Sequence, residues 1–398
     1  MTAENIQKNA KTASEDMQDK DNIKIGYDAK RIVRNGTGLG SYGRTLINSL
    51  ASHAAKGLRY VLYAPDKGRD DLRLQVKEDE TVGYVYPRKA SNALSKALWR
   101  TWGIVDDLKK DGITLFHGLS GELPLGLRRA GIKSIVTIHD LIFMRHPEYY
   151  NWLDTKIYAL KFRLTCREAD RIIAISECTK RDIMAYSNFP EDRIDVVYQS
   201  CGIRFREKEG ESKLQEVHAR YDLPARYILN VGSIEERKNV LLAVKALHYV
   251  PDDISLVIVG RHTKYTDKVR KYADAHGLGG RVRILHGIPD SDLPSLYQMS
   301  ELFVYPSRYE GFGIPIIEAI QCGLPVVACT GSCLEEAGGP DCIYVSPDDD
   351  KAMADAIKAL LVGSEGRQER IERSREYVRR FENTDVAKQM IEEYMKLI

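Results

Sequence analysis

The sequence predicts an α/β protein built from two doubly wound, Rossmann-like domains in tandem, with a cleft between them. Short runs rich in β-branched residues alternate with segments of helical length and polarity, which is typical of parallel sheets covered by helices. The alternation stops once, at a polar and charged stretch over 201–215 that lacks any strand signal, and then restarts. We therefore predict one domain over 22–200 and a second over 201–380, each binding ligands at the carboxyl ends of its strands.

The predicted strands follow from these β-branched runs in chain order. The first domain has runs at 23–27, 60–63, 113–116, 134–138 and 171–175, and a shorter one at 196–198. The second domain has runs at 227–232, 255–260, 282–285, 302–305, 324–328 and 343–345. The charged final segment carries Val386, Met390, Tyr394 and Leu397 at helical spacing. We expect this helix, at about 381–398, to dock back on the first domain.

Composition is that of an ordinary globular protein, with 398 residues, 43% hydrophobic and 29% charged. Residues 1–21 hold almost no large apolar side chains and no apolar core of the signal-peptide type, so we expect a disordered tail. No run approaches the roughly 18 apolar residues of a spanning helix. Seven cysteines, odd in number and without CxxC spacing, indicate reduced thiols. We expect a cytoplasmic protein, with peripheral contact at the inner face of the membrane as an open alternative.

Charge is unevenly distributed along the chain, although the net value is only +2. Residues 22–200 carry 29 basic and 21 acidic side chains, whereas 201–398 carry 27 and 31. The basic first half is suited to an anionic membrane or a phosphate-bearing substrate, and scattered solvated charges are the alternative. Nucleic acid is not expected as a partner, because the basic residues form no dense block and no recognition motif accompanies them.

An amphipathic stretch over 91–110 has two interpretations. Leu94, Leu98, Trp102, Val105 and Leu108 share one helical face. This stripe predicts either packing in the core or docking at a membrane interface.

A glycine-rich segment over 36–43 contains a literal G-x-G-x-x-G that includes Gly38 and Gly40. In a dinucleotide fold the first glycine follows the strand directly, whereas here residues 28–35 intervene, so we do not expect NAD or FAD. We expect a flexible turn before a helix that starts near Ser41, whose free N–H groups approach an anion or a sugar. A purely structural turn is the alternative.

Two further strand ends carry candidate ligand-binding residues. Gly232 and Ser233 follow the first strand of the second domain, and the nearby pair Arg237 and Lys238 could clamp a diphosphate. His139 ends a strand of the first domain, at the edge where α/β proteins bind ligands.

Weaker candidates are a second histidine and two acidic triplets. His117 ends the preceding strand of the first domain and is a second candidate for a ligand-facing histidine. The acidic triplets at 290–292 and 348–350 directly precede helical segments, so we expect them to cap helices and not to hold a metal.

The most informative feature is a pair of glutamates separated by seven residues. Glu310 stands beside a glycine-rich turn, and Glu318 is the only charged side chain from 314 to 327. A helix so apolar is buried on nearly all sides, and burying an unpaired carboxylate is costly. We therefore expect a polar partner that donates hydrogen bonds to Glu318.

Together these motifs resemble the retaining glycosyltransferases of family 4, which have the GT-B fold. The resemblance covers about residues 22–398. It rests on the two glutamates, on the pair at 237 and 238, on the glycine loop, and on the segments TIHD at 137–140, ISECTK at 175–180 and PSRYEGFG at 306–313.

The resemblance implies a role for each candidate residue. Glu318 would hold the ribose of a sugar nucleotide, and Glu310 the hydroxyls of the transferred sugar. Arg237 and Lys238 would neutralise the departing diphosphate, and His139 would lie near the anomeric centre. Backbone groups would complete the donor site, from Gly38, Gly40, Gly232, Ser233, Gly311, Phe312, Gly313 and Ile314.

The function that the resemblance implies is metal-independent transfer of a hexose from a sugar nucleotide to a glycan or lipid-linked acceptor in bacterial polysaccharide synthesis. Mannose from GDP-mannose is the foremost donor expected. Retention by front-face attack is implied by the family alone. A UDP-sugar donor, a sugar-nucleotide epimerase and a non-catalytic sugar-nucleotide-binding protein are the alternatives.

Overall fold

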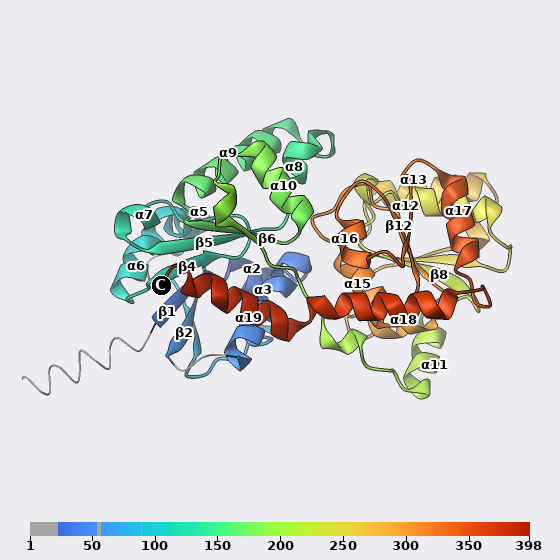
Figure 1. Cartoon of the computed structure of the whole chain (residues 1–398), viewed down its shortest axis with the longest axis horizontal. Helices are drawn as coiled ribbons and strands as arrows, with labels where there is room; N and C mark the ends of the chain where they lie inside the picture. Colours follow the sequence, from blue (N-terminus) through green and yellow to red (C-terminus); the bar gives the residue numbers. More distant parts are fainter. Residues whose placement is uncertain (1–22, 54–56, 89) are drawn as a thin grey trace, which may run out of the picture.

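The computed structural model describes residues 23–53, 57–88 and 90–398. The expected tail, residues 1–21, lies outside the described residues. Two α/β domains lie side by side, each built around one wholly parallel sheet with helices on both faces (Figure 1). The predicted architecture of two doubly wound domains is confirmed.

The sheet of the first domain has seven strands in the order β3-β2-β1-β4-β5-β6-β7. Of these, only the edge strand β3 was not predicted. It is short and half-buried, so it lacks the apolar run that identifies a central strand. The strands are β1 (Ile23–Asp28), β2 (Leu58–Tyr63), β3 (Val82–Val85), β4 (Leu115–Gly118), β5 (Lys133–Ile138), β6 (Arg171–Ala174) and β7 (Ile194–Val196).

The sheet of the second domain has six strands in the order β10-β9-β8-β11-β12-β13. All six lie within two residues of the predicted runs, because strands buried on both faces read as continuous apolar stretches. They are β8 (Tyr227–Val231), β9 (Ser255–Val259), β10 (Val282–Leu285), β11 (Phe303–Tyr305), β12 (Val326–Cys329) and β13 (Ile343–Val345).

The helices cover both sheets and fill the crossovers between parallel strands. Those of the first domain are α2 (Lys30–Arg34), α3 (Gly38–Ser52), α4 (Asp70–Arg73), α5 (Ala93–Leu98), α6 (Ile104–Lys110), α7 (Leu127–Ala130), α8 (Ile142–Arg145), α9 (Trp152–Glu168) and α10 (Glu177–Tyr186). The second domain has α11 (Glu211–Arg220), α12 (Val240–Ala246), α13 (Lys264–Ala275), α14 (Leu293–Met299), α15 (Ile314–Gln321), α16 (Leu334–Gly338), α17 (Asp350–Ala359) and α18 (Arg367–Val378).

The last helix, α19 (Asn383–Met395), returns to the first domain and packs against α3 (Figure 1). Val386, Met390 and Tyr394 are buried in the core that surrounds β1 and β2. The Tyr394 hydroxyl lies 2.8 Å from Nδ1 of His117 on β4. The chain therefore crosses between the domains twice, once after β7 and once after α18.

The amphipathic stretch over 91–110 is helical but does not present one continuous apolar face. Leu94, Leu98 and Trp102 are exposed, whereas Val105 and Leu108 are buried. The reason is a π-helical turn at Trp99–Gly103, between α5 and α6. A π turn holds an extra residue, so side chains before and after it do not share a face.

All seven cysteines are free thiols. Among the helices of the described residues, none combines the length and the apolarity needed to cross a membrane.

Candidate functional site

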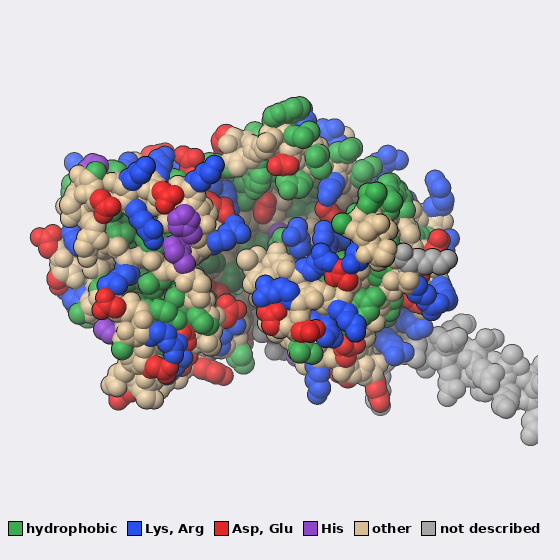
Figure 2. Space-filling model, turned by 180° about the vertical axis from the view of Figure 1, so that it is seen from behind, with side chains coloured by type: hydrophobic (Ala, Val, Ile, Leu, Met, Phe, Trp, Pro, Cys, Tyr) green, Lys and Arg blue, Asp and Glu red, His purple; other side chains and the backbone are tan. Residues whose placement is uncertain are grey.

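A cavity of about 620 Å³ lies between the two domains, and Figure 2 shows the molecule hollowed there. The first domain contributes the start of α3, and the second contributes the ends of β8, β9 and β10 together with the start of α15. Both sheets therefore point their carboxyl ends at this cavity, as expected for doubly wound domains. Of the predicted donor-site residues, Gly38, Gly232, Ile314 and Glu318 line it.

The wall from the first domain is the amino end of α3. This helix begins at Gly38, three residues earlier than predicted, so Gly38 and Gly40 form its first turn and not a flexible loop. A Cβ on Gly40 would lie 1.8 Å from the Asn35 carbonyl oxygen, so glycine is required where α3 passes the end of α2. The amino end of a long helix carries a positive partial charge, which suits an anion in this cavity.

The floor from the second domain is made of glycines that follow three neighbouring strands. They are Gly232 after β8, Gly260 after β9 and Gly287 near the end of β10. A Cβ on Gly260 would lie 1.9 Å from the carbonyl oxygen of Gly232, so no side chain fits there. Of the three, only Gly232 was predicted from the sequence. Gly260 and Gly287 were identifiable by the same signal, because they also stand at strand ends of the same sheet edge, with Arg261, His262 and His286 beside them.

Glu318 faces this cavity from α15, whose neighbouring side chains Ile316, Ile317 and Ile320 are buried. Tyr297 supplies the polar partner, and its hydroxyl donates to Oε2 of Glu318 at 3.0 Å. Burial outweighs this hydrogen bond and raises the pKa of Glu318 to about 7. The carboxyl group is thus partly satisfied by the protein and has room on its cavity side for further donors.

Glu310, Arg237 and Lys238 form one buried cluster beside the interdomain contact. Oε1 of Glu310 lies 3.0 Å from Nη1 of Arg237 and 2.5 Å from Nζ of Lys238, and it accepts a hydrogen bond from Ser307. Burial opposes ionisation of Glu310, but the two cations outweigh it and lower its pKa to about 2. The structure thus brings together three residues that sequence analysis assigned to a sugar and to a diphosphate.

The turn after Glu310 joins the second domain to the first. Ser176, at the amino end of α10, donates from Oγ to the Gly311 carbonyl at 2.6 Å. A Cβ on Gly311 would lie 2.0 Å from the His139 carbonyl oxygen, so glycine is required at this contact. The Phe312 ring is buried against Tyr198, at 5.4 Å between ring centroids, so only its backbone can face a ligand. Gly313 has φ +121° and leads into α15.

His139 lies at the same contact, but protein groups occupy both of its ring nitrogens. Nε2 is 2.8 Å from the carbonyl oxygen of Leu119, and Nδ1 is 2.8 Å from the side-chain amide of Gln199. These bonds suit one neutral tautomer, with Nε2 donating and Nδ1 accepting. Burial lowers the pKa of His139 to about 4, so the ring is neutral near pH 7.

His117, the weaker histidine candidate, lines neither the interdomain cavity nor the cavity beside His139. His117 is fully buried, with Nδ1 at 2.8 Å from the Tyr394 hydroxyl and Nε2 at 2.8 Å from Oγ1 of Thr137. It connects α19 to the sheet.

Asp140 is a residue that sequence analysis did not single out. It lines a cavity of about 280 Å³ in the first domain together with His139, Phe143, Tyr150 and Tyr158. Burial raises the pKa of its carboxyl group, and the charges of Arg237 and Glu310 act on it from the second domain. The available signal was its position directly after His139 at a strand end.

Ser233, one of the predicted donor-site residues, lies in the turn after β8 and outside the lining of the interdomain cavity.

The acidic triplets have structural partners. Asp349 caps α17 by accepting a hydrogen bond from the Ala352 amide at 2.8 Å. Asp292 occupies the cap position of α14 but binds Lys213 at 2.7 Å and Arg220 at 2.6 Å, so its predicted capping bond is wrong. Within the described ranges, no three histidine, cysteine or acidic side chains gather in a metal-binding arrangement.

Two protein-family models match the chain, one in each domain. The family model described as Glycosyltransferase Family 4 matches residues 37–200, and the model described as Glycosyl transferases group 1 matches residues 215–377. The two matches correspond to the two sheets and cover most of the chain. The protein belongs to the family 4 glycosyltransferases and has their GT-B fold.

One relative of known function and two solved structures illustrate the similarity. The chain is 29% identical to O-antigen chain mannosyltransferase B from Escherichia coli over 86% of this chain and 90% of that protein. Among solved structures, it resembles sucrose-phosphate synthase from Thermosynechococcus elongatus, with a TM-score of 0.77, 21% identity and coverage of 94% and 99%. It also resembles Anabaena HepE in complex with UDP-glucose, with a TM-score of 0.73, 16% identity and coverage of 94% and 100%.

Proposed function

We propose that the protein transfers mannose from GDP-mannose to a hydroxyl of a glycan or lipid-linked acceptor, with retention of the anomeric configuration, in bacterial polysaccharide synthesis. The observation that carries the proposal is the interdomain cavity, where the Glu318 carboxyl group faces the amino end of α3. Hydroxyl donors and an anion are the complementary partners of such a site, and a sugar nucleotide offers both.

Glu318 would bind the ribose of the donor. Two adjacent ribose hydroxyls donate hydrogen bonds in the way that the Tyr297 hydroxyl already does. Such bonds favour the ionised carboxylate, so donor binding would lower the pKa of Glu318 from about 7.

The charged cluster would exchange partners when the donor binds. Arg237 and Lys238 would turn from Glu310 to the diphosphate, and Glu310 would then accept hydrogen bonds from the hydroxyls of the mannose. Positive charge aimed at a leaving diphosphate stabilises the transition state, and single contacts of this kind are often worth about 3 kcal/mol. We propose that this charge serves in place of a divalent metal.

The chamber lined by His139 and Asp140 would hold the acceptor sugar. In the transfer step the acceptor oxygen bonds to the anomeric carbon as the bond from that carbon to the phosphate oxygen breaks. The proton of the acceptor hydroxyl passes to the departing diphosphate. Attack and departure on one face of the sugar give retention.

The identity of the donor rests on the relatives. Similarity to O-antigen chain mannosyltransferase B favours mannose and a role in surface polysaccharide. The fold shared with HepE, which was solved with UDP-glucose, supports a UDP-sugar as the second candidate. A cytoplasmic location is proposed because the seven free thiols suit a reducing compartment.

The test is a transfer assay with radiolabelled GDP-mannose and a lipid extract from a polysaccharide-producing bacterium. We expect label in the extract with the wild-type protein, a loss of more than about 100-fold with Glu310→Gln, and no change with the exposed control Glu365→Gln. An altered sugar nucleotide formed from donor alone would instead indicate an epimerase. Proton NMR of the product would report the anomeric configuration.

A further inference from the structure

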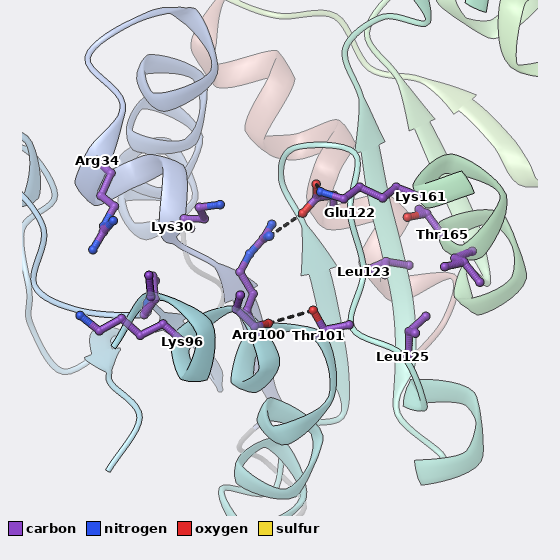
Figure 3. A pocket seen from close by; sticks show the side chains of 14 residues that line it. Lys30, Arg34, Lys96, Arg100, Thr101, Glu122, Leu123, Leu125, Lys161 and Thr165 are labelled. Carbon is purple, nitrogen blue, oxygen red and sulfur yellow. Dashed lines mark hydrogen bonds and ion pairs between the residues drawn. The ribbon is translucent and has the colours of Figure 1, made fainter. Parts of the chain in front are cut away.

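The first domain contains another cavity, of about 480 Å³, between α2, α5 and α9 (Figure 3). It shares no lining residue with the interdomain cavity. Its polar lining is dominated by five cations, which are Lys30, Arg34, Lys96, Arg100 and Lys161.

The carboxylates around these cations do not balance them. Asp66 pairs with Arg34 and Lys96. Asp28 pairs with Arg100, and Glu122 with both Arg100 and Lys161. Five cations against three carboxylates leave two positive charges in excess.

Lys30 is the cation without a direct ion pair. Its ammonium group makes no hydrogen bond or ion pair within the part of the chain that the structure describes. Burial and the charge of Arg100 lower its pKa and outweigh the opposing charges of Glu122 and Asp28. Figure 3 shows Lys30 extending toward Arg100 and Glu122 at the centre of the cavity. Lys30 is half-buried, and an ammonium group partly withdrawn from water without a direct partner is costly, so the cavity favours an anion.

Asp66 and Glu122 are ionised near neutral pH, so the excess of two positive charges already counts both of them as negative. Hydrogen bonding from Arg34 lowers the pKa of Asp66 to about 2. Burial raises the pKa of Glu122, but Arg100 and Lys161 outweigh it and bring the value to about 2.

The rim of the cavity is apolar and exposed. On α9, Leu153, Ile157 and Leu160 share a helical face with Lys161 and Leu164, which line the cavity. Trp152 begins this helix and is 73% exposed.

The facing helix α5 also carries exposed apolar side chains next to residues that line the cavity. Leu94 is 70% exposed and Leu98 is also exposed, next to the lining residues Ala93 and Ala97. Figure 2 shows hydrophobic side chains beside lysines and arginines along the upper edge of this domain. Exposed leucine and tryptophan around a basic site match an amphiphile with an anionic head.

The basic cavity adjoins the chamber assigned to the acceptor sugar. Glu122 and Lys161 line both. A molecule with its phosphate in the basic cavity can therefore extend a sugar toward His139 and Asp140.

We propose that the basic cavity binds the phosphate or diphosphate of a lipid-linked acceptor, with the hydrocarbon chain lying against the exposed residues of α5 and α9. The acceptor role rests on the proposed function, whereas lipid-phosphate binding can be measured without it.

The test is co-sedimentation with phosphatidylcholine vesicles that contain phosphatidic acid, in the absence of any sugar nucleotide. We expect wild-type protein to bind these vesicles more tightly than phosphatidylcholine alone. Lys30→Gln should weaken binding about fivefold, and Lys271→Gln, an exposed lysine on α13, should not. Lys30→Arg should restore binding and thereby exclude misfolding as the cause.

A second pair of variants tests the contribution of the apolar rim. Leu94→Gln should weaken vesicle binding, whereas Leu74→Gln, at an equally exposed leucine on the same domain (71%), should not. Soluble pyrophosphate should compete with the vesicles for wild-type protein. Competition by pyrophosphate without any effect of Leu94→Gln would indicate a free phosphate ligand and overturn the lipid assignment.

Failure of this inference is distinguishable from failure of the proposed function. If Lys30→Gln binds vesicles as Lys271→Gln does, the inference is wrong, even if mannose transfer to a soluble acceptor persists. If Lys30→Gln loses vesicle binding but no transfer from any sugar nucleotide occurs, the lipid-phosphate site stands and the proposed function is wrong.

Discussion

Two carboxyl groups, Glu310 and Glu318, have pKa values that their surroundings shift in opposite directions. Glu310 faces two cations that outweigh its burial, and its pKa falls to about 2, whereas burial raises the pKa of Glu318 to about 7 against the hydrogen bond from Tyr297. In the proposed donor complex both become acceptors for sugar hydroxyls. Binding of the donor would therefore change the hydrogen-bond partners of both carboxyl groups and the pKa of Glu318.

Glu318→Gln should flatten the pH dependence of stability. A carboxyl group whose folded pKa is raised contributes stability that is fully present below its usual value of about 4.5 and is lost as pH rises through about 7. We expect wild-type protein to lose on the order of 2 kcal/mol relative to Glu318→Gln between pH 5 and pH 8.5. Denaturant unfolding of both proteins at the two pH values measures this. Parallel curves for the two proteins would show that Glu318 is not the titrating group.

Lys238→Ala should lower stability as well as turnover. It removes one of the two cations beside the buried Glu310 carboxylate, and an under-compensated buried charge costs on the order of 2 kcal/mol. Lys268→Ala is the control, because its pair with Glu236 is exposed and at 3.6 Å. Adding Glu310→Gln to Lys238→Ala should recover part of the stability but no turnover. Equal stability of the Lys238→Ala and Lys268→Ala variants would rule out this pairing in solution.

At the scale of elements, α19 comes from the carboxyl end of the chain and completes the core of the first domain. Its buried face packs on α3, whose amino end lines the interdomain cavity. Tyr394 reaches His117, and His117 reaches Thr137, which lies 3.1 Å from the Tyr42 hydroxyl. The ring of Tyr42 in turn meets His139 edge-on at 4.8 Å.

Met390→Ala should destabilise the protein by about 3 kcal/mol, because it leaves a cavity in a closed core. Met395, on the same helix, is 43% exposed, so Met395→Ala should cost less than about 0.5 kcal/mol. Denaturant unfolding of the two variants makes the comparison. Similar small losses in both would mean that α19 is not docked as described.

Gly311→Ala should hold the two domains apart. The added Cβ would overlap the His139 carbonyl oxygen, and the contact lies between domains and not within either core. We expect a larger radius of gyration by small-angle X-ray scattering and a loss of turnover, with little change in unfolding. Gly210→Ala is the control, since a Cβ there meets nothing within 4 Å. An unchanged radius of gyration in Gly311→Ala would contradict a closed arrangement of the domains.

For the whole molecule, the fold was largely predictable and the contacts between distant segments were not. Central strands such as β8 and β9 are buried on both faces, so their apolar runs identify them. The edge strand β3 has no such run. The π turn at Trp99–Gly103 changes which side chains share a face, and periodicity calculated for a regular helix does not detect it.

In the candidate site, too, single residues were predictable from the sequence and their contacts with distant segments were not. Glu318 was identifiable because a lone carboxylate in an apolar helix demands a partner. Its partner Tyr297 comes from α14, at a separation that only the tertiary fold specifies. Likewise, the pairing of Glu310 with Arg237 and Lys238 could not be predicted, because strand ends distant in sequence meet only in the folded sheet. His117 was a weaker candidate for a ligand-facing residue, and the sequence did not reveal that Tyr394 of α19 covers it.

The central claim is that a sugar nucleotide binds between the domains through Glu318, and calorimetric titration of GDP-mannose tests it most directly. We predict one site per chain, tighter binding of GDP-mannose than of UDP-glucose, and about tenfold weaker binding by Glu318→Gln, since a hydrogen bond to a charged group is worth about 1.5–3 kcal/mol. Equal affinity of wild-type protein and Glu318→Gln for GDP-mannose would contradict the account.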